Sequence, residues 1–168
     1  MISNGKFYES QFEEATIELL REAHWQYAFG DDIHRKYTDP LIEEDLRNFL
    51  AVQYKDKNLT TSEMDSIVAN LRNTGGQNDY YALRNTFLLY RDGYDFAYSD
   101  GRSNPFRLEY IDFEHPDHNI FRCVNQFVME QGRENRRPDI LLFINGIPVC
   151  IIELKNPTKQ NATIHDAH

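Results

Sequence analysis

The dipeptide Asn145-Gly146 constrains the fold of this 168-residue chain more than any other feature. Both residues tolerate the positive φ angles of a type I′ turn, so Asn-Gly between two apolar runs predicts a β-hairpin. The runs span residues 140–144 and 149–152, and each is almost continuously apolar. Such runs are typical of strands that are covered on both faces. We therefore expect this hairpin at the centre of a sheet.

Three charged residues lie at the open end of the hairpin. Pairing the strands across the turn sets Asp139 roughly opposite Ile152 and Glu153, and alternation points Glu153 and Lys155 the same way. A desolvated carboxylate needs a positive partner. One interpretation is an ion pair, in which Lys155 neutralises Glu153 and Asp139 caps the strand end. The other is a divalent cation between the two acids, where oxygen ligands favour Mg²⁺ or Mn²⁺ over Zn²⁺.

The pattern Pro-Asp followed by Glu-x-Lys resembles the motif of the PD-(D/E)xK nucleases. Longer stretches resemble the N-terminal endonuclease domain of the restriction (R) subunit of type I restriction-modification enzymes. These stretches are RRPD at 136–139, FINGIP at 143–148, IELKNP at 152–157, NIF at 119–121, VNQF at 124–127 and, more weakly, Phe12-Glu13. The resemblance covers most of the chain, with firm motifs from about residue 119 to residue 157.

The resemblance implies an α/β (α+β) fold of the restriction-endonuclease type, with a mixed, mostly antiparallel central sheet flanked by helices. It also implies Mg²⁺-dependent hydrolysis of phosphodiester bonds in double-stranded DNA. Asp139 and Glu153 would hold the metal, with the backbone of Leu154 as a further ligand. Lys155 would position or activate the attacking water.

Two further residues are candidates for the same site. Aligning Phe12-Glu13 with the first helix of the family makes Glu13 a candidate acid, although Glu13 could equally complete a capping box with Ser10. Gln126 either faces the site or serves as a structural hydrogen-bond partner.

The family also implies partners. Type I R subunits work with methyltransferase and specificity subunits, and the specificity subunit recognises the DNA target. An ATP-driven translocase follows the nuclease domain in the family. The chain contains no G-x-x-x-x-G-K-[ST] motif, so we expect ATP to bind only in motor domains outside it. Two alternatives remain: a nuclease of a repair or recombination system, and a non-catalytic DNA-holding or docking domain of the same fold.

The net charge of −9 disfavours tight, independent binding to DNA. The charge is uneven, because residues 119–168 carry six Lys or Arg against five Asp or Glu, whereas residues 1–118 carry twelve against twenty-two. We expect weak contacts to the phosphate backbone from Arg136, Arg137 and Lys159, with a partner presenting the DNA. Cys123 and Cys150 lie in apolar surroundings and are predicted to be buried thiols in a reducing bacterial or archaeal cytoplasm. No apolar run is long enough to span a membrane.

The length indicates a single domain over residues 1–168, which the resemblance implies is a nuclease domain. Its expected parts are a first helix at 10–25 within the segment 1–25, a helical insertion over 38–90 with helices at about 40–53, 61–73 and 79–89, and a sheet over 94–157. Strands are predicted at 94–98, 106–113 and 119–129, with a polar loop at 130–136. Residues 114–118, which include two histidines, are interpreted as a turn and not as a metal site. A helix that starts near residue 163 suggests a fragment of a longer subunit, with a C-terminal helix and a last strand missing.

Overall fold

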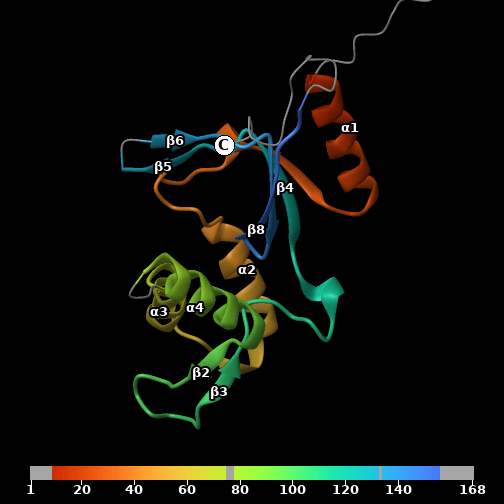
Figure 1. Ribbon diagram of the computed structural model, residues 1–168. Helices are drawn as coiled ribbons and strands as arrows, with labels where there is room; N and C mark the ends of the chain where they lie inside the picture. The colour runs from red at the N-terminus through yellow and green to blue at the C-terminus, as the bar shows by residue number, and fades with distance from the viewer. Residues whose placement is uncertain (1–8, 75–77, 133, 156–168) are drawn as a thin grey trace, which may run out of the picture. The chain divides into compact units, whose positions relative to one another are not determined.

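The computed structural model of the chain describes residues 9–74, 78–132 and 134–155 (Figure 1). The chain divides into two compact units. The first comprises Met1–Pro40 and Phe121–His168, carries the main sheet and is called the sheet unit. The second comprises Leu41–Ile120 and is called the helical unit. Each unit is described by itself.

The main sheet of the sheet unit has four strands within the described residues. Their order is β1 (Gln26–Phe29), β4 (Phe121–Asn125), β7 (Ile140–Ile144) and β8 (Ile147–Ile152). β1 runs parallel to β4, whereas the β4–β7 and β7–β8 pairs are antiparallel. Together with the helices, this mixed, mostly antiparallel sheet confirms the expected fold class.

The predicted hairpin forms at the predicted turn. Asn145 and Gly146 have φ angles of 51° and 74°, as a type I′ turn requires. The pairing starts at Ile144 and Ile147 on either side of the turn. The local sequence is therefore sufficient to place the turn and to start the register.

A β-bulge interrupts this hairpin two residues from the turn. Phe143 pairs with Pro148, but Leu142 pairs with Cys150, so Val149 is the extra residue of β8. Beyond the bulge the regular pairing resumes and reaches the far end of β7. The bulge shifts the register of everything that follows by one residue.

The two arms of the hairpin differ in burial. β7 lies between β4 and β8, and its residues Ile140 and Phe143 are fully buried. β8 is the edge strand of the described sheet, and its residues Val149 and Ile151 are 41% and 55% exposed. Within the described residues, β8 therefore lies at the edge of the sheet and not at the expected central position. Pro148 was the missed signal, because proline lacks a backbone N–H and is tolerated mainly on edge strands.

The first helix, α1 (Glu9–Glu22), lies beside β1 in the sheet unit (Figure 1). It ends three residues before the predicted limit, because His24 takes a positive φ of 67° and the chain turns into β1. Trp25 then packs its ring 5.2 Å from that of Phe121 on β4. Ser10 lies inside α1, so it is not the N-cap of a capping box.

The segment after β4 differs from the predicted pattern. Gln126 has a positive φ of 57° and ends β4, four residues before the predicted limit of that strand. The predicted polar loop forms a short hairpin instead, made of β5 (Met129–Gln131) and β6 (Glu134–Arg136). Polar residues can form such a ribbon where it meets solvent, and Glu130 and the whole of β6 are exposed.

The helical unit contains the three helices that the sequence predicts. They are α2 (Glu43–Gln53), α3 (Thr61–Arg72) and α4 (Asp79–Asp92). Thr60 and Glu63 form the expected capping box of α3. α2 begins at Glu43 and not at residue 40, and no side chain caps it.

The sheet expected over residues 94–157 is divided. β2 (Tyr94–Phe96) and β3 (Phe106–Leu108) pair with each other in a separate two-stranded sheet of the helical unit. The strand predicted at 106–113 ends at Leu108, and 3-10 turns occur at Gly30–Asp32, Lys55–Lys57 and Pro116–His118 (η1, η2 and η3). The alternating pattern at 106–113 predicted a longer strand, but the residues after Leu108 enter a turn that is fixed by Asp112.

The interior of the helical unit is mainly apolar. The side chains buried to within 1% exposure include Leu46, Leu50, Ile67, Val68, Leu108 and Tyr110. Each such side chain stabilises the fold by about 1.5–3 kcal/mol relative to full exposure. The Tyr110 hydroxyl donates to the Ile67 carbonyl at 2.8 Å, which satisfies its polar atom inside the core.

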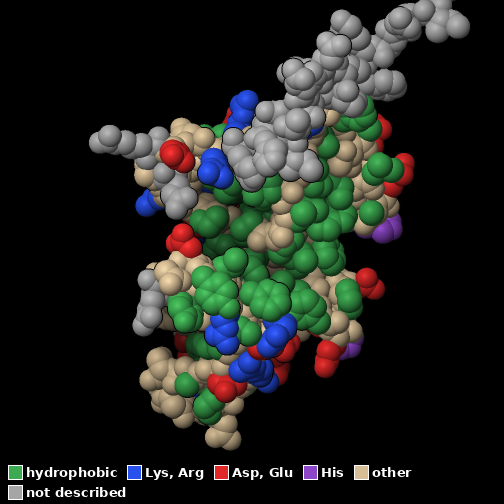
Figure 2. All heavy atoms as spheres, in the orientation of Figure 1, with side chains coloured by type: hydrophobic (Ala, Val, Ile, Leu, Met, Phe, Trp, Pro, Cys, Tyr) green, Lys and Arg blue, Asp and Glu red, His purple; other side chains and the backbone are tan. Residues whose placement is uncertain are grey.

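The surface also carries apolar side chains. Figure 2 shows hydrophobic side chains over α4, where Tyr80, Leu83 and Phe87 are 59–72% exposed. In the part of the chain that the structure describes, no helix is both long enough and apolar enough to cross a membrane.

Candidate active site

Asp139 connects the ends of three strands in the sheet unit. It is half-buried and directly precedes β7. Its Oδ2 accepts a hydrogen bond from the N–H of Leu154 at 2.7 Å, just beyond β8. Its carbonyl accepts one from the N–H of Gln126 at 3.2 Å, just beyond β4. Among the described residues Oδ1 has no hydrogen-bond partner, so one carboxylate oxygen is left for a ligand.

Glu153 lies next to Asp139 in the register of the hairpin. The last pair of the two strands is Ile140 with Ile152, so one further step along each strand leads to Asp139 and Glu153. Glu153 and Lys155 are both exposed and flank Leu154, whose N–H binds Asp139. Alternation along an extended chain points Glu153 and Lys155 to one side. The two acids and the lysine therefore share one end of the hairpin.

Glu13 of α1 reaches the same end of the sheet through β4. Its Oε1 accepts hydrogen bonds from Asn125 Nδ2 at 2.9 Å and from Gln126 Nε2 at 3.4 Å. The Tyr27 hydroxyl donates to Asn125 Oδ1 at 3.0 Å. Burial and the Glu13 carboxylate raise the pKa of Tyr27, so its hydroxyl keeps its proton. Sequence analysis missed Asn125 and Tyr27, although Asn125 directly precedes the candidate Gln126.

The backbone of Gln126 is held on two sides. Its N–H binds Asp139, as above, and η1 of the same unit approaches its carbonyl. A Cβ at Gly30 would lie 2.4 Å from the Gln126 oxygen, so only glycine fits there. Gln126 thus links Glu13 through its side chain to Asp139 through its backbone.

The predicted DNA-contacting residues are only partly described. Arg136 is the last residue of β6, and both it and Arg137 are exposed. Exposure of this kind is what a contact to the phosphate backbone requires. Lys159 lies outside the described residues.

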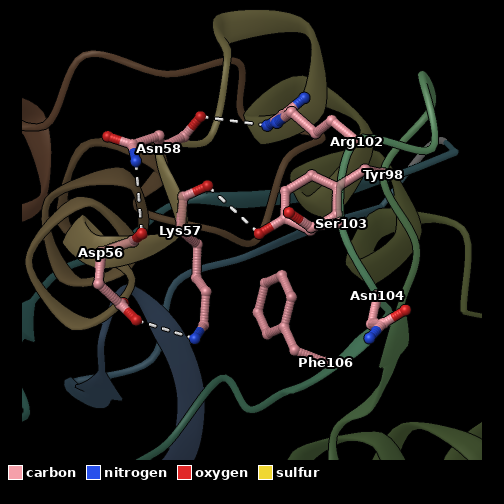
Figure 3. A pocket seen from close by; sticks show the side chains of 8 residues that line it. All are labelled: Asp56, Lys57, Asn58, Tyr98, Arg102, Ser103, Asn104 and Phe106. Atoms are coloured by element: carbon pink, nitrogen blue, oxygen red, sulfur yellow. Dashed lines mark hydrogen bonds and ion pairs between the residues drawn. The ribbon is translucent and has the colours of Figure 1, made fainter.

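The helical unit contains a pocket whose lining includes Lys57, Arg102 and Phe106 (Figure 3). Its two cations are already paired: Arg102 with Glu63 and Asp100 at 2.7 and 3.1 Å, and Lys57 with Asp56 at 2.8 Å. The lining therefore offers an anion such as phosphate little positive charge.

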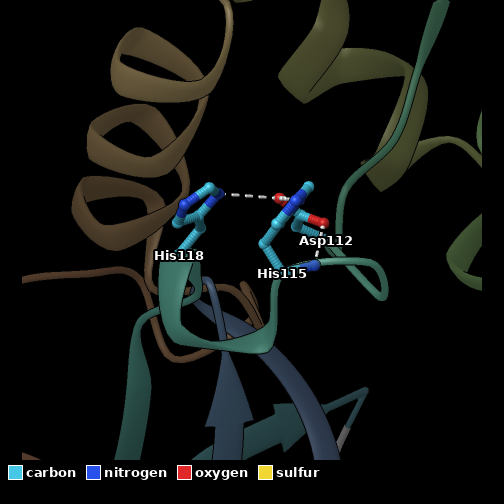
Figure 4. A group of neighbouring side chains, drawn as sticks. All are labelled: Asp112, His115 and His118. Carbon is cyan, nitrogen blue, oxygen red and sulfur yellow. Dashed lines mark hydrogen bonds and ion pairs between the residues drawn. The ribbon is translucent and has the colours of Figure 1, made fainter.

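A turn of the helical unit brings two histidines to one buried carboxylate. His118 Nδ1 lies 2.9 Å and His115 Nδ1 3.6 Å from Asp112 Oδ2 (Figure 4). Burial alone would raise the pKa of Asp112, but hydrogen bonds from the His115 N–H, His118 and Gln53 outweigh it and lower that pKa. The interpretation of residues 114–118 as a turn omitted Asp112, which lies two residues upstream of this segment.

Comparison with known proteins identifies the family. The family model described as type I restriction enzyme R protein N terminus matches residues 6–168. The chain belongs to this family. It is 31% identical over 170 residues to the type I restriction enzyme HindI endonuclease subunit of Haemophilus influenzae, an alignment that covers 95% of the chain and 16% of that subunit.

A second relative comes from an archaeon. The putative type I restriction enzyme MjaIXP endonuclease subunit of Methanocaldococcus jannaschii is 30% identical over 163 residues, which cover 92% of the chain and 16% of the relative. The chain thus spans about one sixth of the length of these type I restriction subunits. Nuclease function is implied for the R-subunit family by these names.

The end of the hairpin fits the hard cation that a nuclease of this type would use. Asp139, Glu153 and the Leu154 carbonyl supply oxygen donors only, which is the set that Mg²⁺ and Mn²⁺ prefer. Glu13 Oε1 accepts hydrogen bonds from the side-chain amides of Asn125 and Gln126. Within the described residues, the carboxylates of Glu13, Asp139 and Glu153 do not converge within 4.8 Å as a group of three. The Glu13 carboxylate is thus bound to the side chains of Asn125 and Gln126 and does not join the two acids of the hairpin end in such a group.

Proposed function

We propose that this domain is the endonuclease module of a type I restriction R subunit and hydrolyses phosphodiester bonds of double-stranded DNA with Mg²⁺. The observation that carries the proposal is the Asp139–Leu154 hydrogen bond, which fixes the end of β8 against the start of β7. Leu154, which donates that bond, lies between Glu153 and Lys155 in the chain, so both charged residues are close to Asp139 in sequence register. The set of Asp139, Glu153 and Lys155 supports a nuclease over a non-catalytic docking domain, because a domain without turnover has no need of all three.

Each residue has a distinct role in this proposal. Asp139 and Glu153 hold the cation, and the Leu154 N–H orients the Asp139 carboxylate by occupying one of its oxygens. The Leu154 carbonyl is a further ligand. When bound, the cation supplies positive charge at the phosphate and lowers the pKa of a bound water. The Lys155 ammonium orients the attacking water and stabilises the negative charge that develops on the phosphate.

Glu13 and Gln126 act as positioning residues in the proposed site. Glu13 holds the side chains of Asn125 and Gln126, and the Gln126 N–H holds the Asp139 carbonyl. This chain of bonds ties α1 to the strand end that bears Asp139. It fixes where the Asp139 carboxylate stands before any cation binds.

DNA would reach the site with the help of other subunits. The net charge of −9 gives the domain little attraction for a phosphate backbone of its own. We propose that methyltransferase and specificity subunits present the DNA, while Arg136, Arg137 and Lys159 make local contacts. ATP would bind only in motor domains outside this chain, and the whole enzyme would act on DNA in the cytoplasm.

A Mn²⁺-soaked crystal of the 168-residue chain, with anomalous maps, tests the metal site. We expect a peak within about 2.0–2.3 Å of carboxylate oxygens of Asp139 and Glu153. Asp139→Asn should remove the peak, whereas Asp31→Asn, at an exposed acid of η1, should leave it in place. A map with no peak and with Lys155 bonded to both acids would instead leave two explanations, a plain ion pair or a site that opens only with the helix expected after this segment. Repeating the soak on a chain extended past residue 168 separates the two.

Cleavage is tested in the assembled type I enzyme. Asp139→Ala in the R subunit should abolish cutting of a DNA with recognition sites, while the subunit stays folded and assembled. Glu14→Gln, at an exposed acid of α1, is the matched control and should cut like the wild type. Unchanged cleavage by Asp139→Ala would remove the assignment of the active site.

A further inference from the structure

The turn after β3 gathers three metal-ligating side chains that the proposed nuclease site does not use. Asp112, His115 and His118 follow each other at intervals of three residues, and η3 carries the chain between the histidines. They are the group of His, Cys, Asp or Glu side chains in the described part of the chain whose ligand atoms all lie within 4.8 Å of one another. All three belong to the helical unit.

The histidine rings present the same nitrogen to the same oxygen. The rings stack at 5.0 Å between centroids with an angle of 20° between their planes. His118 Nδ1 lies 2.9 Å and His115 Nδ1 3.6 Å from Asp112 Oδ2 (Figure 4). The backbone of this turn, and not a long flexible side chain, sets the convergence.

We propose that Asp112, His115 and His118 bind a Zn²⁺ ion through one carboxylate oxygen and two imidazole Nδ1 atoms. Ligand atoms about 2.0–2.1 Å from zinc at tetrahedral angles lie about 3.3–3.4 Å from each other. The separations of 2.9 and 3.6 Å lie on either side of this value. Because the two rings are nearly parallel, the exposed histidine side chains would rotate so that both Nδ1 lone pairs point at the ion.

The carboxylate is already oriented by its neighbours. Asp112 Oδ1 accepts hydrogen bonds from the N–H groups of Glu114 and His115 at 3.1 and 2.8 Å. Gln53 Nε2 donates to Oδ2 at 3.1 Å. The side chain of Asn119 binds both the N–H and the carbonyl of Asp112, at 2.9 and 2.7 Å. Such partners around a ligand fix its geometry and raise its affinity for metal.

The charge balance favours a cation at this place. Asp112 is 5% exposed, and in the described residues its hydrogen-bond partners are amides and backbone N–H groups, with the two histidines beside it. A buried carboxylate without a Lys or Arg partner is costly, and a dication would compensate it. When the metal binds His118 through Nδ1, the neutral imidazole carries its proton on Nε2, so Nδ1 no longer donates to Asp112.

The donor atoms of this site favour Zn²⁺ over Mg²⁺, which is the cation proposed for the nuclease site. Imidazole nitrogen suits Zn²⁺, whereas Mg²⁺ prefers oxygen ligands. The side chains of His115 and His118 are 64% and 56% exposed, which leaves the fourth position to water. The two metal sites would therefore load independently.

Zinc titration of the 168-residue chain, stripped of metal by a chelator, tests this site. His165→Ala and His168→Ala are made first in all samples, because these two histidines lie outside the described residues and can bind zinc nonspecifically. We expect one Zn²⁺ per chain by calorimetry, and replacement of Zn²⁺ by Co²⁺ should give the visible absorption of a four-coordinate ion. His115→Ala and His118→Ala should each weaken binding at least about 10-fold.

Three controls make the result specific. His34→Ala, at an exposed histidine of the sheet unit, should bind zinc like the parent. Asp139→Asn should also leave zinc binding unchanged, which separates this site from the proposed nuclease site. Gln53→Leu, which removes the amide that orients Asp112, should weaken binding about 10-fold or more while the histidines remain.

Two results would overturn the proposal. One is the absence of stoichiometric zinc binding at up to about 100 μM free Zn²⁺ by the folded chain, as judged by far-ultraviolet circular dichroism. The other is zinc binding that survives both His115→Ala and His118→Ala. Because both side chains are largely exposed, these variants should fold and report on binding alone.

Discussion

Asp112 and Asp139 show how two aspartates with similar backbone contacts can serve different chemistry. Asp112 accepts hydrogen bonds from the N–H groups of Glu114 and His115, and Asp139 accepts one from the N–H of Leu154. Asp112 is buried and both of its oxygens are engaged, whereas Asp139 is half-buried and has one oxygen without a partner among the described residues. The first arrangement fixes a turn and two imidazoles around it. The second leaves an oxygen free to join those of a neighbouring acid.

The two sites also differ in how far apart along the chain their parts lie. Asp112 and its histidines come from one turn of seven residues, so local geometry alone assembles them. Asp139 meets Leu154 across a hairpin and Gln126 across two strands. The Asp139 site therefore exists only when the sheet is folded, which ties its chemistry to the tertiary structure.

The largest effect should come from the charged residues next to Asp139. In the assembled enzyme, Glu153→Gln and Lys155→Ala should each reduce DNA cleavage at least about 100-fold, because each removes a charge that acts on the transition state. Cutting of a plasmid substrate measures the effect. Lys36→Ala, at an exposed lysine of the sheet unit, is the control. Full activity of Lys155→Ala would support the interpretation of the hairpin end as an ordinary ion pair.

Glu13 should have a smaller effect of a different kind. Glu13→Gln weakens the hold on Asn125 and Gln126, and we expect cleavage to fall about 10-fold, as for other residues that orient metal ligands. The Mg²⁺ concentration for half-maximal cleavage should rise, which a purely structural role of Glu13 would not produce. Glu14→Gln gives the baseline. An unchanged Mg²⁺ requirement in Glu13→Gln would contradict the positioning role.

Substitution of Asp112 should reduce the stability of the fold more than substitution of Asp139, although Asp139 matters more for the proposed cleavage. Asp112→Ala leaves several N–H groups and the Gln53 amide without their acceptor, so unfolding free energy should drop by about 1–3 kcal/mol. Asp139→Asn keeps an oxygen for the Leu154 N–H, so its effect should stay below about 1 kcal/mol. Urea unfolding of the metal-free chain compares the two. Equal losses would show that Asp139 is as much a structural residue as Asp112.

Glu63, also in the helical unit, gives the smallest expected effect. Hydrogen bonds from Arg102 and from Thr60 lower the pKa of Glu63 from 4.5 to about 2. A lowered pKa contributes stability that is present above pH 4.5 and is lost as the pH falls towards 2. Glu63→Gln should therefore flatten the pH dependence of unfolding between pH 5 and pH 2, measured by thermal melts. A slope in Glu63→Gln as steep as in the wild type would assign the acid sensitivity to other carboxylates.

Local patterns predicted much of this fold. Asn145-Gly146 fixed its turn, and Thr60 with Glu63 fixed the start of α3, because both signals depend only on neighbouring residues. The apolar run of β8 was predicted at the centre but lies at the edge of the described sheet, because an apolar run alone does not distinguish the two positions. Pro148 carried the missing information.

In the candidate sites, too, the sequence predicted some residues, whereas others come together only in the folded structure. The sequence and its family resemblance named Asp139, Glu153 and Lys155, and the structure adds the Leu154 N–H that holds Asp139. Asn125 and Tyr27 could not be predicted, because the bonds of Asn125 to Glu13 and to Tyr27 each join segments about one hundred residues apart. The buried thiol was predicted for both cysteines, but Cys150 is exposed on the edge strand and only Cys123 is buried.

The extra residue in β8 has a consequence for the spacing of the two acids. A regular hairpin with a two-residue turn places an even number of residues between any two partners across it. Thirteen residues separate Asp139 from Glu153, because β7 supplies five and β8 six around the turn. An odd interval cannot close without one unpaired residue. The position of the Asn-Gly turn and the distance between the two acids thus jointly require an irregularity in the hairpin, and counting residues would detect it in related sequences.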